Sequence, residues 1–132
     1  MKSDIEERKV VGVYIAIIPN EYPEKEPWNV YLVNDNDFPI DDILINSKGF
    51  GTKDGKEVET STFKQYYPML EGRSFYKIET ITPEVFDLNN RFWVTYYING
   101  KIYDKKFLFT PGSISIHHLT ELPVLEERGV LH

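Results

Sequence analysis

The residues of this chain best suited to hold a metal ion are four aspartates close together in the sequence. They are Asp35, Asp37, Asp41 and Asp42. Hard cations such as Ca²⁺ take several carboxylate and carbonyl oxygens, and loops of a β-sandwich can supply them. The EF-hand pattern is absent, because the sixth position from Asp35 is Ile40 and the twelfth is Asn46, not glycine and glutamate. The alternative is a solvated turn in which Asp and Asn side chains bond their own backbone.

Other reactive side chains form no recognisable catalytic pattern. His117 and His118 are adjacent and His132 is distant, and neighbours in a strand point to opposite faces, which disfavours a shared zinc ion. The chain has no cysteine, which excludes disulfides and thiolate chemistry. It also lacks a Gly-x-Ser-x-Gly elbow, a phosphate loop and a dinucleotide glycine pattern. We therefore predict no cofactor, and an enzyme would need an unrecognised site.

Aromatic side chains are the remaining candidates for binding. Aromatic residues make up 14% of the chain, enough to offer flat surfaces for a sugar ring or a protein partner. The candidate binding residues are Trp28, Tyr31, Trp93, Tyr97 and Lys106. The alternative interpretation is cross-strand packing, since aromatic pairs stabilise sheets without any ligand.

The segment 91–109 positions three of these residues. Two aromatic and β-branched runs flank Asn99-Gly100, a pair that tolerates the positive φ angles of a type I′ hairpin turn. A two-residue turn sets Phe92 opposite Phe107 and Tyr96 opposite Tyr103. The predicted core face holds Phe92, Val94, Tyr96, Ile98, Tyr103 and Phe107. The other face holds Trp93, Thr95, Tyr97, Ile102, Asp104 and Lys106, with Lys106 placed for a cation–π contact with Trp93.

The segment 9–18 reads as a strand that is apolar on both faces. Val11, Val13, Ile15 and Ile17 make one face, and the other includes Val10, Tyr14 and Ile18. Both faces must therefore be covered, either by a loop or by another chain. Self-pairing of this strand would give a symmetric dimer with Val10, Tyr14 and Ile18 as its contacts.

Further strands are predicted at 28–34, 42–50, 58–66 and 74–81, with a short helical turn near 82–87. The tail 113–132 is ambiguous, with a final short strand around 122–125. About seven short strands separated by turns predict an all-β, two-sheet antiparallel sandwich that is immunoglobulin-like or fibronectin III-like. A small barrel is the rival architecture. We expect a single domain over 1–132, with flexible ends at 1–8 and 126–132.

Four segments carry a resemblance to a known group of proteins. They are Trp28-Asn-Val-Tyr-Leu-Val-Asn34, Ser47-Lys-Gly-Phe-Gly51, Leu88-Asn-Asn-Arg-Phe-Trp-Val94 and Ile102-Tyr-Asp-Lys-Lys-Phe107. In these segments the chain resembles a small family of uncharacterised bacterial proteins. The resemblance implies a compact β domain and no particular activity.

Composition narrows the possible partners. Lys plus Arg is 15 and Asp plus Glu is 21, for a net charge of −6, which argues against nucleic acid as a partner. The apolar run 10–18 is too short to span a bilayer and lacks the flanks of a signal peptide, so we predict a cytoplasmic protein without a membrane partner. The leading hypothesis is a non-catalytic interaction or assembly module that binds a protein partner or a second copy. The alternatives are a carbohydrate-type ligand-binding sandwich and an enzyme with an unrecognised site.

Overall fold

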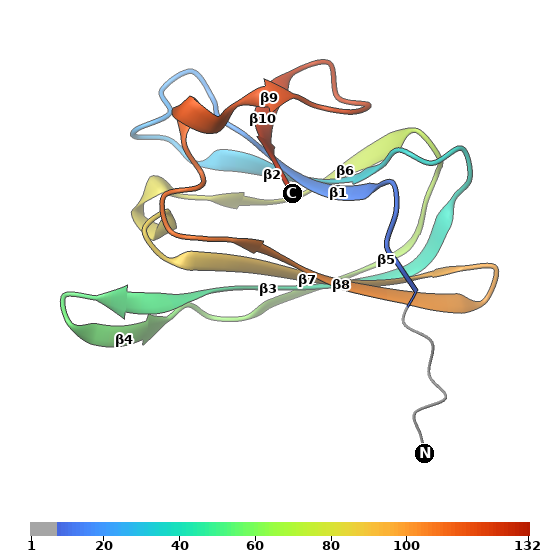
Figure 1. The fold of residues 1–132 in the computed structure, drawn as a ribbon, viewed down its shortest axis with the longest axis horizontal. Coiled ribbons are helices and arrows are strands. Elements are labelled where there is room, and N and C mark those ends of the chain that lie inside the picture. Colours follow the sequence, from blue (N-terminus) through green and yellow to red (C-terminus); the bar gives the residue numbers. More distant parts are fainter. Residues whose placement is uncertain (1–7) are drawn as a thin grey trace.

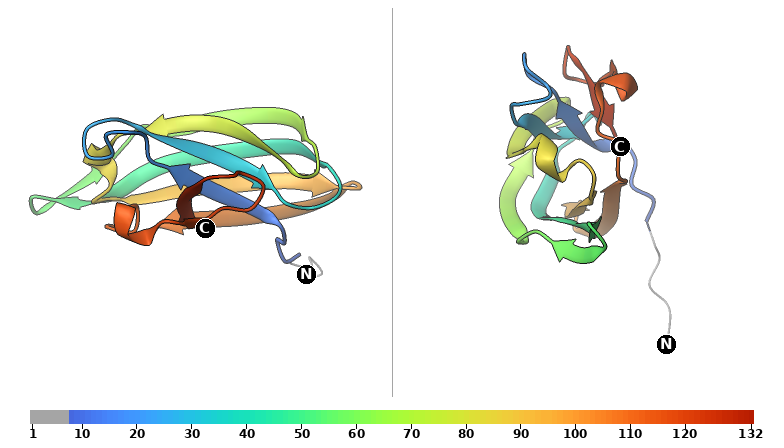
Figure 2. Two further views of the ribbon diagram at one scale, coloured as in Figure 1. Left: turned by 90° about the horizontal axis from the view of Figure 1, so that it is seen from above. Right: turned by 90° about the vertical axis from the view of Figure 1, so that its left-hand side faces the viewer.

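The computed structural model describes residues 8–132, which form two antiparallel β-sheets packed face to face (Figures 1 and 2). The first sheet, the upper layer of Figure 1, has the order β6-β2-β1-β10-β9. The second has the order β4-β3-β7-β8, with β5 also paired to β3. The strands are β1 (Val13–Ile18), β2 (Trp28–Asn34), β3 (Ile40–Lys53), β4 (Lys56–Glu59), β5 (Phe63–Leu70), β6 (Ser74–Ile81), β7 (Asn89–Ile98), β8 (Lys101–Phe109), β9 (Thr120–Glu121) and β10 (Arg128–Leu131). Strands hold 58% of the residues and helical turns 5%, which confirms the all-β sandwich.

The predicted hairpin is confirmed in register. Phe92 pairs with Phe107, Tyr96 with Tyr103, and Ile98 with Lys101 across the turn. The strands predicted at 28–34 and 74–81 are β2 and β6, and the helical turn is the 3₁₀ helix η1 (Pro83–Val85).

Three segments differ from the sequence-based prediction. The expected strand 58–66 is split into β4 and β5, because the Thr60 hydroxyl accepts a hydrogen bond from Gly49 N at 2.7 Å between them. The predicted strand at 122–125 is wrong, since these residues form the loop between β9 and β10. At the end expected to be flexible, Arg128–Leu131 forms β10 and pairs with β1.

The main core fills the space between the two sheets. Its largest side chains are at most 2% exposed, and most of them lie at alternating positions along β2, β3, β7 and β8. They include Trp28, Tyr96, Phe92, Phe107 and Phe109. The rings of Tyr96 and Tyr103 stack across the hairpin with centroids 5.3 Å apart. Close packing of this kind fixes how the two sheets lie on each other.

A second, smaller core explains why the first strand is apolar on both faces. Ala16, Ile18 and Val33 on the outer face of the first sheet pack against Leu122 and Leu125 of the β9–β10 loop. The loop of the same chain therefore covers this face. Tyr14 packs partly against this smaller core and Val10 against the main one.

The position of β1 also bears on the predicted dimer. β1 lies between β2 and β10, so it lacks the free edge that self-pairing requires. Ile18 is only 6% exposed, which removes it from the surface available to a second chain. The structure thus removes the reason for a dimer built on Val10, Tyr14 and Ile18.

One buried side chain joins the two connections that cross between the sheets at one end. Asn34 is fully buried, and its Nδ2 donates to the carbonyl oxygens of Phe38, Leu70 and Glu71 at 2.9, 3.2 and 3.1 Å. Phe38 belongs to the β2–β3 connection, whereas Leu70 and Glu71 lead from β5 to β6. The Asn34 carboxamide therefore satisfies carbonyl groups from both crossings at once.

We expect Asn34→Leu to lower the free energy of unfolding by about 2–4 kcal/mol, because the buried carbonyl of Leu70 and the part-buried carbonyls of Phe38 and Glu71 lose this donor. Denaturant unfolding followed by tryptophan fluorescence measures the change. Asn29→Leu on the same strand is the matched control and should stay within about 0.5 kcal/mol of the wild type. Equal losses in the two variants would contradict the role given to Asn34.

Candidate functional site

The structure does not bring the four predicted aspartate ligands together. Arg73 bridges two of them, with Nη1 2.6 Å from Asp35 Oδ1 and Nη2 2.9 Å from Asp37 Oδ1. The hydrogen bond and charge of Asp37 raise the pKa of Arg73. Asp42 instead accepts a hydrogen bond from the Tyr66 hydroxyl at 2.7 Å, while Asp41 lies opposite Tyr97 in the ladder. Within residues 8–132, no three Asp, Glu or His side chains are grouped around one point.

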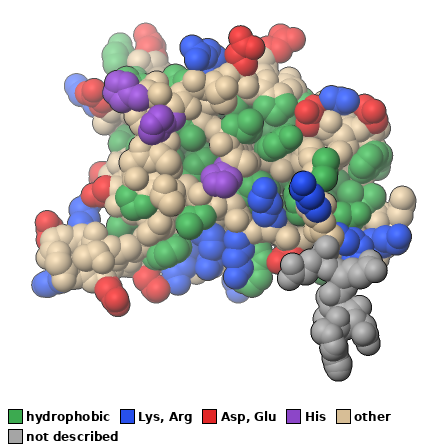
Figure 3. All heavy atoms as spheres, viewed as in Figure 1, with side chains coloured by type: hydrophobic (Ala, Val, Ile, Leu, Met, Phe, Trp, Pro, Cys, Tyr) green, Lys and Arg blue, Asp and Glu red, His purple; other side chains and the backbone are tan. Residues whose placement is uncertain are grey.

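Two histidines that are separated in the sequence line the same hollow. His118, in the 3₁₀ helix η2 (Ile116–His118), and His132 both line a hollow of about 310 Å³ beside β8. All three histidines appear on the face shown in Figure 3. Burial against neighbouring groups and the charge of Lys105 lower the pKa of His132. Two imidazoles alone do not make a zinc site, which takes three or four ligands.

The predicted aromatic binding residues separate into three places. Trp28 belongs to the core, which corrects the prediction: it is 2% exposed and its Nε1 donates to Pro23 O at 2.8 Å. Tyr31 lies on the outer face of the first sheet, with its ring edge-on to Phe75. Trp93, Tyr97 and Lys106 lie on the outer face of the second sheet. Only these last three remain together as candidates.

Trp93 is held in place by charged neighbours. Lys106 Nζ lies 4.4 Å from the centroid of its ring, which confirms the predicted cation–π contact, and Arg91 Cζ lies 5.7 Å from it. The Trp93 Nε1 donates to Asp104 Oδ1 at 2.6 Å, and the Thr95 hydroxyl donates to the same oxygen. These contacts fix the indole on the surface of the sheet.

Three apolar side chains extend this surface, of which the sequence analysis had placed only Ile102 on this face. Tyr66, Leu44 and Ile102 are 55%, 53% and 44% exposed. Leu44 pairs with both Tyr66 of β5 and Thr95 of β7, so their side chains share the outer face. We call this surface the outer platform, made of Leu44, Tyr66, Trp93, Thr95, Tyr97 and Ile102. Leu44 was overlooked because it lies between Ile43 and Ile45, in a run that resembles a fully buried strand.

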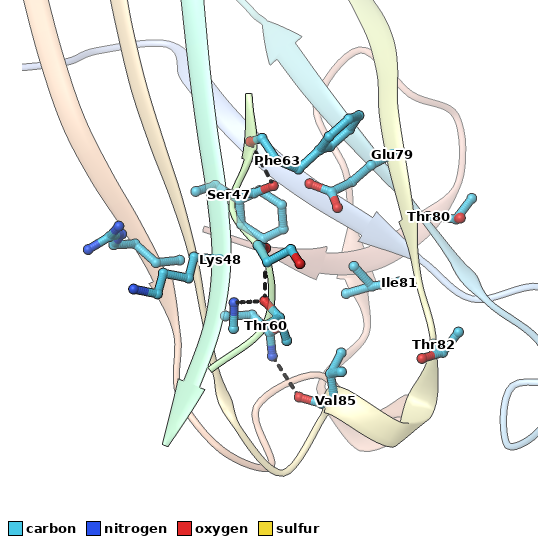
Figure 4. A pocket seen from close by; sticks show the side chains of 14 residues that line it. Ser47, Lys48, Thr60, Phe63, Glu79, Thr80, Ile81, Thr82 and Val85 are labelled. Atoms are coloured by element: carbon cyan, nitrogen blue, oxygen red, sulfur yellow. Dashed lines mark hydrogen bonds between the residues drawn. The ribbon is translucent and has the colours of Figure 1, made fainter. Parts of the chain in front are cut away.

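A separate cleft of about 300 Å³ lies between the edges of the two sheets (Figure 4). It forms where β3 stops pairing with β5 and begins to pair with β4. Residues 60–62 connect these two strands and belong to neither. A register shift between Val30 and Tyr31 sets Glu79 of β6 opposite Val30, whose side chain faces the core. The bulge therefore turns Glu79 toward Ser47 and Phe63, as Figure 4 shows.

Glu79 is the charged group of this cleft. Its Oε1 is buried, and no donor within residues 8–132 reaches that atom. Burial raises the pKa of the Glu79 carboxyl, and a hydrogen bond with Ser47 opposes this shift. The basic residues at the rim point elsewhere: Lys48 Nζ pairs with Glu59 at 3.0 Å, and Arg91 lies beside Trp93 on the outer face. Figure 4 shows Lys48 directed away from the cleft.

Comparison with known proteins adds no relative. No protein-family model matches the chain, and no curated protein is significantly similar to it. Over the described residues, no helix is long and apolar enough to cross a membrane. The outer platform and the cleft are therefore the features from which a function can be inferred.

The raised pKa of Glu79 predicts a specific pH dependence of stability. Below the ordinary value of 4.5, folded and unfolded chains both hold the proton. As pH rises above it, the unfolded chain releases the proton first, so this residue lowers stability progressively until the folded carboxyl has also ionised. We expect Glu79→Gln to gain stability over the wild type between acid and neutral pH, measured by urea unfolding. Glu57→Gln, on exposed β4, is the control, and a gain of the same size and pH dependence there would refute the assignment.

Proposed function

We propose that this protein is a non-catalytic interaction module that binds a protein partner through the outer platform. The observation that carries the proposal is the exposed pair Tyr66 and Leu44, each more than half exposed, beside a tryptophan fixed by two cations. Protein interfaces are enriched in Tyr, Trp and Arg, and such residues contribute most of the binding energy when a partner covers them. A sheet face that needed only to be soluble would carry polar side chains at these positions.

The charges around the platform indicate an acidic partner. Lys64, Arg91 and Lys106 surround it and outnumber Asp42 and Asp104 on the same face, although the whole chain carries a net charge of −6. Figure 3 shows lysine and arginine side chains gathered along the lower layer, which is the second sheet. Two copies meeting through this face would bring like charges together, so charge complementarity favours a different protein with acidic groups around an apolar contact.

The strand order supports the more specific immunoglobulin-like or fibronectin III-like assignment. In that architecture strands A, B and E lie in one sheet and C, F and G in the other. Here β1-β2-β6 and β3-β7-β8 occupy corresponding positions along the chain and in space. Sandwiches of this kind serve many unrelated functions, so the assignment supports a binding scaffold without naming a partner. A cytoplasmic location remains part of the proposal and is supported by the acidic composition.

Carbohydrate binding is a weaker alternative. Sugar stacking needs an open aromatic face, and the ammonium of Lys106 occupies one face of Trp93. Trp28, the other indole, lies in the core. An enzyme is also a weaker alternative, because acid–base reactions generally use two or more positioned groups, and Glu79 is the one ionisable group directed into the cleft among its described lining residues.

The platform is tested by site-specific crosslinking in extracts of the source cells. We expect a photo-crosslinking phenylalanine analogue at position 66 to give one discrete adduct, and the same analogue at Tyr22 to give none. Tyr22 is a matched control because it is 59% exposed in the loop between β1 and β2. High salt should reduce the yield of adduct, since basic groups surround the contact.

Placing a charge within the apolar contact completes this test. Leu44→Lys should lower the yield of adduct at least about tenfold, as expected for an interface residue at the centre of a contact. Val11→Lys, at a position 63% exposed and away from the platform, should leave it unchanged. Equal adducts from positions 66 and 22, or insensitivity to Leu44→Lys, would overturn the proposal. An adduct of twice the mass of the chain would replace the acidic partner by a second copy.

A further inference from the structure

We propose that the cleft between the sheet edges binds the primary ammonium group of a small aliphatic amine, with Glu79 as its carboxylate partner. The inference goes beyond the proposed protein contact, which uses the outer face of the second sheet. It begins with Glu79 Oε1, a buried carboxylate oxygen that no donor within residues 8–132 reaches. A buried charge of this kind is costly unless a cation or a donor meets it.

The polar groups of the cleft suit an ammonium ion. The Ser47 hydroxyl lies next to the carboxyl and makes a hydrogen bond with it, and Oγ also contacts the more distant Phe63 O at 3.5 Å. Its oxygen can therefore still accept a hydrogen bond. An ammonium group carries three donors and no acceptor, so it can reach Glu79 and Ser47 together. The Thr60 hydroxyl is already engaged, since it accepts from Gly49 N and donates to Ser61 O.

The remaining walls suit a short hydrocarbon chain. Phe63, Ile81 and Val85 line the cleft, and Figure 4 shows them around the space in front of Glu79. A volume of about 300 Å³ is at the lower end of small-molecule pockets, which favours a ligand of a few carbon atoms. The body of the amine would therefore contact apolar side chains while its charged end meets the carboxylate.

Other cations fit this cleft less well. Calcium takes six to eight oxygen ligands, whereas the described lining supplies one carboxylate. A guanidinium group prefers both oxygens of a carboxylate in a planar fork, whereas here Oε1 is the oxygen left buried and unpaired. No lysine or arginine of the lining offers a substitute, because Lys48 pairs with Glu59 and Arg91 lies over Trp93.

The proposal is tested by titrating the full chain with n-butylammonium chloride and recording backbone amide shifts by NMR. We expect saturable shifts at Ser47, Phe63 and Ile81, with n-butanol and butyrate producing none at these positions. Glu79→Gln should weaken binding at least about tenfold, as for loss of a charged hydrogen bond. Glu57→Gln removes the same charge from the exposed strand β4 and should bind like the wild type.

A second variant separates the loss of the carboxylate charge from the loss of one hydrogen-bond acceptor. Ser47→Ala removes one acceptor and leaves the charge, so it should weaken binding by a smaller factor than Glu79→Gln. Unchanged binding in Glu79→Gln, equal response to n-butanol, or no saturable shift with n-butylammonium would each overturn the proposal. None of these outcomes affects the outer platform, because Tyr66 and Leu44 lie outside the cleft lining.

Discussion

The carboxamide of Asn34 is the interaction on which the arrangement of the two sheets depends. Both connections near it, β2 to β3 and β5 to β6, pass from one sheet to the other, and the Asn34 carboxamide donates to the buried carbonyl of Leu70 and to the part-buried carbonyls of Phe38 and Glu71. Asn36 extends the contact, because its Nδ2 donates to Asn34 Oδ1 and to Val11 O. β3 and β6 both start at this end, and the cleft lies between them farther along both strands.

Two local irregularities in the strands direct side chains into the two candidate sites. Asp42 has a φ of 46°, and a register shift on β3 accompanies it. The Asp42 side chain can then accept a hydrogen bond from the Tyr66 hydroxyl on the outer face. On β6 a second shift directs Glu79 between the sheets. Bulges of this kind redirect side chains without unfolding a strand, which is why they occur near functional sites.

The sequence predicted those parts of the fold that depend on local rules. The register of the hairpin follows from Asn99-Gly100 alone, and β2 and β6 follow from apolar runs between turn residues. The role of Trp28 was not predictable, because an indole in a strand has the same pattern whether it faces a ligand or the core. Arg73 likewise lies far along the chain from Asp35 and Asp37, so its neutralisation of the acidic cluster depends on tertiary structure.

Each candidate site contains a residue whose exposure could not be predicted from the sequence. Leu44 looked buried because its neighbours are apolar, yet it is exposed, since only one face of the second sheet meets the core. Nothing in the sequence around Glu79 indicates its burial, and a shift of one residue in register turns it inward. The burial of the Glu79 carboxylate lowers stability and is only partly offset by Ser47, because no donor among the described residues reaches the buried Oε1. A chain selected for stability alone would carry glutamine or an apolar side chain there, so the cost favours a ligand that supplies the missing positive charge.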